Sequence, residues 1–146
     1  MSKLKAITVE TTVNAGLDKV WRFWTEPEHI KNWNNASPDW HTPKAENDLR
    51  KGGRFSSRME AKDGSMGFDF GGTYDEVVLH KQIKYTLDDD RKVDITFAKA
   101  DEGLSIKEIF EPESQNSTDM QKQGWQAILD NFKKYIESNN GSNDKN

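Results

Sequence analysis

Residues that could support enzyme chemistry are few and scattered in this sequence. It contains no cysteine, which excludes thiolate nucleophiles, disulfides and cysteine-ligated metals. The three histidines, His29, His41 and His80, stand at a predicted helix start, in a loop and at a strand end, without the spacing of a metal site. The acidic run Asp88–Asp90 lacks the alternating ligands and the glycine of a calcium loop. We therefore predict no catalytic residue, no metal and no cofactor.

Two glycine pairs and one group of charged residues have structural explanations. Gly52-Gly53 and Gly71-Gly72 are not followed by the Lys-Ser/Thr of a phosphate-binding loop, and neither pair opens a helix, so turns or bulges are expected there. Arg58 and Glu60 alternate with apolar residues of a predicted strand and should face solvent. A bulge that inverted this register would instead bring Arg58 and Asp69 into the interior as a charged pair.

The remaining chemical signal is aromatic. Five tryptophans, three tyrosines and seven phenylalanines recur across the predicted elements, a distribution that suits either a filled core or the wall of a ligand cavity. Ligand sites are mostly apolar with a few polar groups, which Ser57, Tyr74 and Gln121 could provide. The predicted ligand-binding residues are Trp33 and Trp40 at the entrance, Phe68, Phe70, Trp125 and Leu129 in the walls, and Phe55, Met59, Tyr74, Phe97 and Gln121 around them.

The element that must position these side chains is a helix predicted over Asp119–Ile136. At about 100° per residue, one narrow arc of this helix carries only large apolar side chains after its first turn. Gly124 costs about 1 kcal/mol relative to alanine inside a helix, and the polar Gln121 lies in the apolar arc. Both residues indicate that the N-terminal half of the helix overlooks a cavity. Thr118, with Gln121 three residues later, has the form of a capping box.

The other elements are predicted from local periodicity. Alternation of apolar and polar residues predicts a strand over Ile7–Val13, and two short helices separated at Pro27 follow it. Asparagine, serine and proline predict a loop from 34 to 47, and tight turns then join about five or six strands between 54 and 111. The order predicts an α+β fold: a curved antiparallel sheet of about six or seven strands wrapped around a long C-terminal helix.

Length and composition limit the domain organisation and the partners. The chain has 146 residues, so we predict a single domain over residues 1–137 and a disordered tail over 138–146. A net charge of −4, without a basic face, argues against nucleic-acid binding. No stretch approaches the roughly 20 apolar residues of a membrane span. The N-terminal residues lack the apolar core of a signal peptide. A cytoplasmic location is expected.

Several motifs resemble one known family. The chain is similar, over residues 4 to 137, to the SRPBCC superfamily, which includes START lipid-transfer domains and the birch-pollen allergen, and within it to the C-terminal domain of the activator of the heat-shock-protein-90 ATPase. The motifs that carry the resemblance are Val20–Pro27, Gly52–Phe55, Gly71–Val77, Phe110–Glu113 and Gln123–Phe132. The resemblance implies the helix-grip fold and the binding of lipids, sterols, polyketides or other apolar molecules.

These observations favour a binding protein that holds a small apolar or aromatic molecule between the sheet and the last helix. One alternative is an enzyme of the polyketide-cyclase kind, which a strongly perturbed carboxylate pKa inside the cavity would favour. The other alternative is a chaperone-ATPase activator or a stress-related interaction module with a chaperone as its partner. That alternative predicts an exposed apolar patch outside the pocket.

Overall fold

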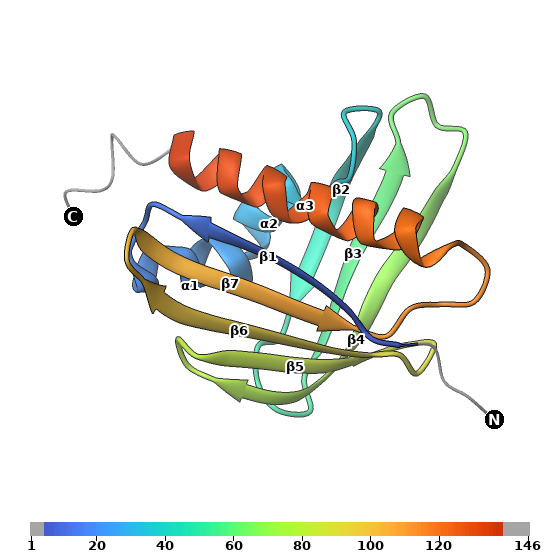
Figure 1. The fold of residues 1–146 in the computed structure, drawn as a ribbon. Coiled ribbons are helices and arrows are strands. Elements are labelled where there is room, and N and C mark those ends of the chain that lie inside the picture. The colour runs from blue at the N-terminus through green and yellow to red at the C-terminus, as the bar shows by residue number, and fades with distance from the viewer. Residues whose placement is uncertain (1–4, 139–146) are drawn as a thin grey trace.

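A single antiparallel sheet curls around one long helix (Figure 1). The computed structural model describes residues 5–138. In chain order the elements are β1 (Ile7–Val13), α1 (Leu17–Thr25), α2 (Pro27–Trp33), β2 (Trp40–Asn47), β3 (Arg54–Ala61), β4 (Gly67–Val78), β5 (Gln82–Leu87), β6 (Lys92–Ala100), β7 (Gly103–Phe110) and α3 (Thr118–Ser138). The predicted α+β architecture is confirmed. The tail expected over 138–146 lies outside the described residues, apart from Ser138, the last residue of α3.

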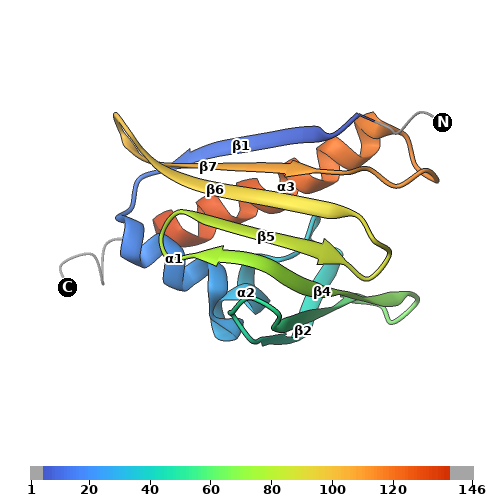
Figure 2. The same ribbon diagram turned by 90° about the horizontal axis from the view of Figure 1, so that it is seen from below.

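The seven strands are hydrogen-bonded in the order β1-β7-β6-β5-β4-β3-β2. From β2 to β7, each strand pairs with the next along the chain, so tight turns connect them. The segment α1–α2 carries the chain from β1 at one edge of the sheet to β2 at the other. Figure 2 shows α3 along one face of the sheet, with α1 and α2 closing one end.

The two halves of α3 meet different surroundings. In its C-terminal half Leu129, Phe132 and Ile136 are completely buried. Phe132 packs edge-on against Trp24 and Trp33, with ring centroids 4.9 and 5.0 Å away. The packed core therefore lies at the end of the sheet that α1 and α2 close, and the N-terminal half of α3 extends beyond it.

The predicted loop over 34–47 is partly wrong, because residues 40–47 form the edge strand β2. This strand pairs with β3, and its register shifts between His41 and Lys44. Pro43 lies within the shift and has no N–H to donate, and edge strands and bulges are where a sheet tolerates proline. Proline and asparagine therefore led to a loop prediction for residues 40–47, although the backbone there is an extended strand.

The predicted capping box at the start of α3 does not form. Thr118 is the first helical residue, and the hydroxyl of Ser117 accepts a hydrogen bond from the N–H of Met120 at 3.1 Å. The amide of Gln121 instead bonds the segment before the helix: its Oε1 accepts from the N–H of Glu113, and its Nε2 donates to the carbonyl of Glu113, both at 2.9 Å. Gln121 therefore fixes the β7–α3 connection against the helix.

Candidate functional site: a cavity under the N-terminal half of the last helix

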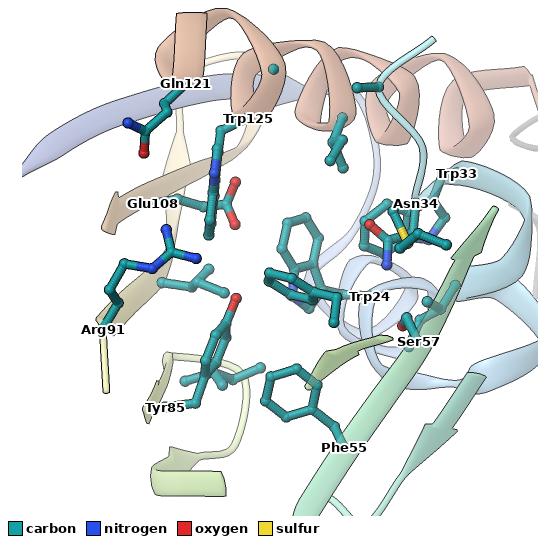
Figure 3. Close-up of a pocket in the computed structure, with 18 of the residues that line it drawn as sticks. Trp24, Trp33, Asn34, Phe55, Ser57, Tyr85, Arg91, Glu108, Gln121 and Trp125 are labelled. Atoms are coloured by element: carbon teal, nitrogen blue, oxygen red, sulfur yellow. The ribbon is translucent and has the colours of Figure 1, made fainter. Parts of the chain in front are cut away.

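A cavity of about 380 Å³ lies between the sheet and the N-terminal half of α3 (Figure 3). Strands β3 to β7 supply its floor, and α1, α2 and α3 supply side chains around it. Gly124 of α3 lines the cavity, and a Cβ atom added there would meet no other atom within 4 Å. Close packing therefore does not require a glycine at this position, and the space beside it belongs to the cavity.

Most of the predicted ligand-binding residues line this cavity. Strand β3 supplies Phe55 and Met59 through period-two alternation, because every second side chain of a strand points to the same face. Trp125 of α3 stacks on Phe110, with ring centroids 3.9 Å apart and planes 8° apart, and meets Phe70 edge-on. The predicted residues that line the cavity are Trp33, Phe55, Met59, Phe68, Phe70, Tyr74, Gln121 and Trp125.

Three predicted residues lie outside the lining. Phe97 packs edge-on against Trp21 and Trp24 in the core, with ring centroids 5.4 and 5.8 Å away. Leu129 is fully buried in the packed half of α3. Trp40 lies on the edge strand β2 and contacts the ring of Phe68 from outside the cavity.

The exposure of the lining residues indicates an entrance at a different place from the predicted one. Trp33 is only 5% exposed, and its indole N–H donates a hydrogen bond to the carbonyl of Phe23 at 3.0 Å, so it belongs to the inner wall. The exposed aromatic side chain of the lining is Phe68, at 49%. Phe68 therefore lies where the cavity opens to solvent, with Trp40 against its outer side.

The outward orientation predicted for the charged residues of β3 is confirmed. Arg58 donates from Nε to Glu60 at 2.9 Å and from Nη1 to the exposed Asp69 at 3.4 Å. Ser57 and Met59, on either side of Arg58 in the sequence, line the cavity. The inverted register, which would have put a charged pair inside, does not occur.

Two of the predicted polar groups already have protein partners. The hydroxyl of Tyr74 donates to Oδ1 of Asn47 at 2.5 Å, and the Gln121 amide is bonded to the β7–α3 connection. Burial raises the pKa of Tyr74 well above its usual value, so this hydroxyl stays neutral. These two side chains are therefore held in place by the fold before any ligand enters.

A carboxylate that the sequence analysis did not single out faces the cavity. Glu108 is 6% exposed and lies on β7 among inward-facing apolar residues, between Ile106 and Phe110. No described residue donates a hydrogen bond to its carboxylate. Burial raises the pKa of Glu108 from 4.5 to about 8, because the charged form loses its hydration. The alternation of β7 alone would have indicated this inward carboxylate.

Tyr85 and Arg91 lie beside Glu108 on the same side of the cavity (Figure 3). Tyr85 is an inward-facing residue of β5, and burial, reinforced by the Glu108 carboxylate, raises its pKa. Its hydroxyl has no hydrogen-bond partner among the described residues. Arg91 follows β5 and donates from Nε to Asp89 at 2.8 Å. This side of the cavity therefore combines two O–H groups that are largely neutral at pH 7 with one cation.

No described part of the chain offers a metal site or a membrane-spanning helix. Over residues 5–138 no three histidine, aspartate or glutamate side chains gather as metal ligands would. None of the helices in the same range is long and apolar enough to cross a membrane.

The curled sheet, the long C-terminal helix and the two short helices after the first strand define a helix-grip protein of the SRPBCC superfamily. The family model described as "Activator of Hsp90 ATPase homolog 1-like protein" matches residues 14–137. The chain belongs to this family, as its motifs predicted.

Solved structures agree with this assignment. An AHSA1-like protein from Aeromonas hydrophila is 42% identical, with 92% of this chain and 93% of that chain covered and a TM-score of 0.87. A protein from Cytophaga hutchinsonii is 53% identical over the same shares of the two chains, with a TM-score of 0.80. A protein from Chromobacterium violaceum is 25% identical, covers 91% of this chain and 97% of its own, and has a TM-score of 0.81. No curated protein matches the chain.

Proposed function

We propose that this protein binds a small apolar or aromatic molecule, such as a lipid, a sterol or a polyketide-like compound, in the cavity beneath α3. The observation that carries the proposal is the open space of about 380 Å³ beside Gly124, walled mainly by apolar side chains, many of them aromatic. Its volume lies within the roughly 300–1,000 Å³ of small-molecule sites, and its lining is apolar with a few polar groups, as in such sites. The family match supports the proposal, because proteins of this superfamily commonly bind hydrophobic ligands.

The test is an amide-NMR titration of the full chain with a fatty acid, a sterol and a planar aromatic compound. Saturable shifts at Phe70, Trp125 and their neighbours are expected with at least one compound. Gly124→Leu should abolish those shifts, because its side chain would occupy the open space. Gln123→Leu adds the same side chain at an exposed position of the same helix and should leave the shifts unchanged. Shifts that persist in Gly124→Leu, or none with any compound, would contradict the proposal.

A second candidate function is acid–base catalysis of the polyketide-cyclase kind. Glu108 favours it, since buried catalytic carboxylates have raised pKa values. The distinguishing experiment is incubation with a poly-β-ketone substrate, followed by product analysis. Formation of a cyclised product that Glu108→Gln abolishes would support catalysis, and recovery of unchanged substrate would leave binding as the function.

The chaperone-related alternative remains a prediction. The large exposed apolar side chains are spread over several elements, with Met66 and Phe68 at the β3–β4 hairpin, Leu79 between β4 and β5, Ile109 on β7 and Met120 on α3. Binding of the ligand-free protein to a purified heat-shock-protein-90 chaperone would test it. The cytoplasmic location expected from the sequence likewise remains a prediction.

A further inference from the structure

Two buried hydroxyl-bearing groups face the cavity without a protein partner. Glu108 is 6% exposed and Tyr85 is 8% exposed. Neither side-chain oxygen is hydrogen-bonded to a described residue, yet both residues line the cavity. Figure 3 shows the Glu108 carboxylate beside the ring of Trp125 and the Tyr85 hydroxyl below it, both directed into the open space. The oxygens themselves are open to the cavity, because no side-chain oxygen of the described residues is both fully buried and unpaired. A polar atom of a ligand can therefore reach them there and take the place of water.

The protonation of these two groups decides what kind of partner fits. At neutral pH the Glu108 carboxyl is largely protonated, because its pKa is raised to about 8, and Tyr85 is neutral because burial raises its pKa. Each then offers an O–H donor. The other titratable or charged residues of the lining are Arg91, Tyr74 and Glu113.

Because Glu108 and Tyr85 are O–H donors, a ligand atom that binds them must be a hydrogen-bond acceptor. The other titratable or charged groups of the lining are compatible with such an acceptor. Arg91 is a cation, which favours an oxygen atom and disfavours an ammonium group beside it. The hydroxyl of Tyr74 donates a hydrogen bond to Oδ1 of Asn47. The carboxylate of Glu113 accepts from the side-chain amide and the backbone N–H of Asn116. Tyr74 and Glu113 are therefore already engaged with protein partners, whereas Glu108 and Tyr85 have no hydrogen-bond partner among the described residues.

We infer that Glu108 and Tyr85 together bind the carbonyl oxygen of the ligand, so that this protein selects planar apolar ketones over hydrocarbons of the same shape. The inference rests on the proposed function, because it names the chemical class that the same cavity takes. Tyrosine and a protonated carboxylic acid in an apolar site form an established arrangement for binding a ketone or enolate oxygen. The aromatic walls contribute shape, and the two donors contribute orientation.

The experiment compares two rigid tricyclic probes, fluorenone and fluorene, which differ only in the carbonyl group. Affinities are measured for the full chain and for Tyr85→Phe and Glu108→Leu, each of which removes one donor. Glu108→Gln retains an N–H donor at the same place. Tyr135→Phe and Glu76→Leu make the same substitutions outside the cavity. Near-ultraviolet circular dichroism checks that each variant is folded.

Tyr85→Phe and Glu108→Leu should each weaken fluorenone binding about 2- to 12-fold, the range for one lost hydrogen bond. Fluorene binding should not change, and Glu108→Gln should recover part of the loss. The infrared carbonyl band of bound fluorenone should lie at lower frequency in the original chain than in the double variant, because hydrogen bonding weakens the C=O bond.

The outcomes separate the two proposals. If both probes bind but the variants weaken them equally or not at all, and the carbonyl band does not move, carbonyl recognition is wrong while the cavity remains a binding site. If neither probe binds the original chain, both proposals fail for planar aromatic ligands. Loss of fluorenone affinity in Tyr135→Phe or Glu76→Leu to the same extent would also overturn the inference.

Discussion

Replacing Glu108 by glutamine should remove a pH dependence of folding stability. The pKa of this side chain is about 8 in the folded protein against an ordinary value of 4.5, a difference of about 3.5. Between these two pH values the folded state holds a proton that the unfolded chain has lost. Stability therefore falls as the pH rises through this window, since the unfolded state binds fewer protons there. Below pH 4.5 both states are protonated and the effect vanishes.

Each pKa unit corresponds to about 1.36 kcal/mol, so the loss of unfolding free energy is about 3 kcal/mol at pH 7 and approaches about 5 kcal/mol above pH 8. Glutamine has nearly the shape of the protonated acid but does not titrate. The difference in unfolding free energy between Glu108→Gln and the original chain should therefore grow with pH. All other titrating groups are shared by the two proteins and cancel in this difference.

The assay is urea unfolding of both proteins at several values between about pH 5 and about pH 8.5, a range that brackets the window in which the difference is expected to grow. Glu76→Gln makes the same substitution at an exposed position of β4 and serves as the control. Its stability should follow that of the original chain at every pH. A constant difference between Glu108→Gln and the original chain would refute the reasoning, because it would mean that Glu108 is charged in the folded state throughout.

Three further predictions concern stability, each measured by chemical denaturation. Gly124→Ala should stabilise the protein by about 0.5–1 kcal/mol, because the added methyl group meets no atom while the helix gains propensity; destabilisation would show that the space is filled. Asn47→Ala should lower the free energy of unfolding by about 2–3 kcal/mol, since it removes hydrogen bonds to Tyr74 and to the last carbonyl of α1. The loss should be smaller in a Tyr74→Phe background, where one of these bonds is already absent. An equal loss in both backgrounds would show that Asn47 and Tyr74 are not coupled. Leu129→Ala should lower the free energy of unfolding by about 2–5 kcal/mol and Phe68→Ala by under about 1 kcal/mol, because Leu129 is fully buried and Phe68 is half exposed. Similar losses for the two variants would contradict the assignment of Leu129 to the core and of Phe68 to the cavity opening.

Local patterns were sufficient to predict most of the secondary structure. Alternation identified β1 and the strands from β3 to β7, and 3.6-residue periodicity identified α3, because these periods arise from backbone geometry within each segment. The strand β2 was missed because it is an edge strand with a single buried side chain and carries Pro43 at its register shift. Such a segment has the composition of a loop and becomes a strand only by pairing with β3.

The candidate site was predicted in part. The sequence identified the inward aromatic residues of β3, β4 and α3, because each belongs to a periodic apolar face. It did not separate cavity from core: Leu129 and Trp125 lie on the same face of α3, but only Trp125 lines the open space. The difference depends on which residues lie opposite each turn of the helix. Phe132 packs against Trp24 of α1 and Trp33 of α2, whereas Trp125 packs against Phe70 of β4 and Phe110 of β7.

The sequence by itself determined the family, the identity of most elements and the amphipathic last helix, because motifs and periodicity are local properties. Only the tertiary structure decided which polar groups already have partners. Tyr74 is paired with Asn47, 27 residues away in the chain, whereas Tyr85 and Glu108 face the cavity without a described partner. Hydrogen bonding and desolvation depend on contacts between distant segments, so the protonation state of Glu108 was set by the fold and could not be read from its place in β7.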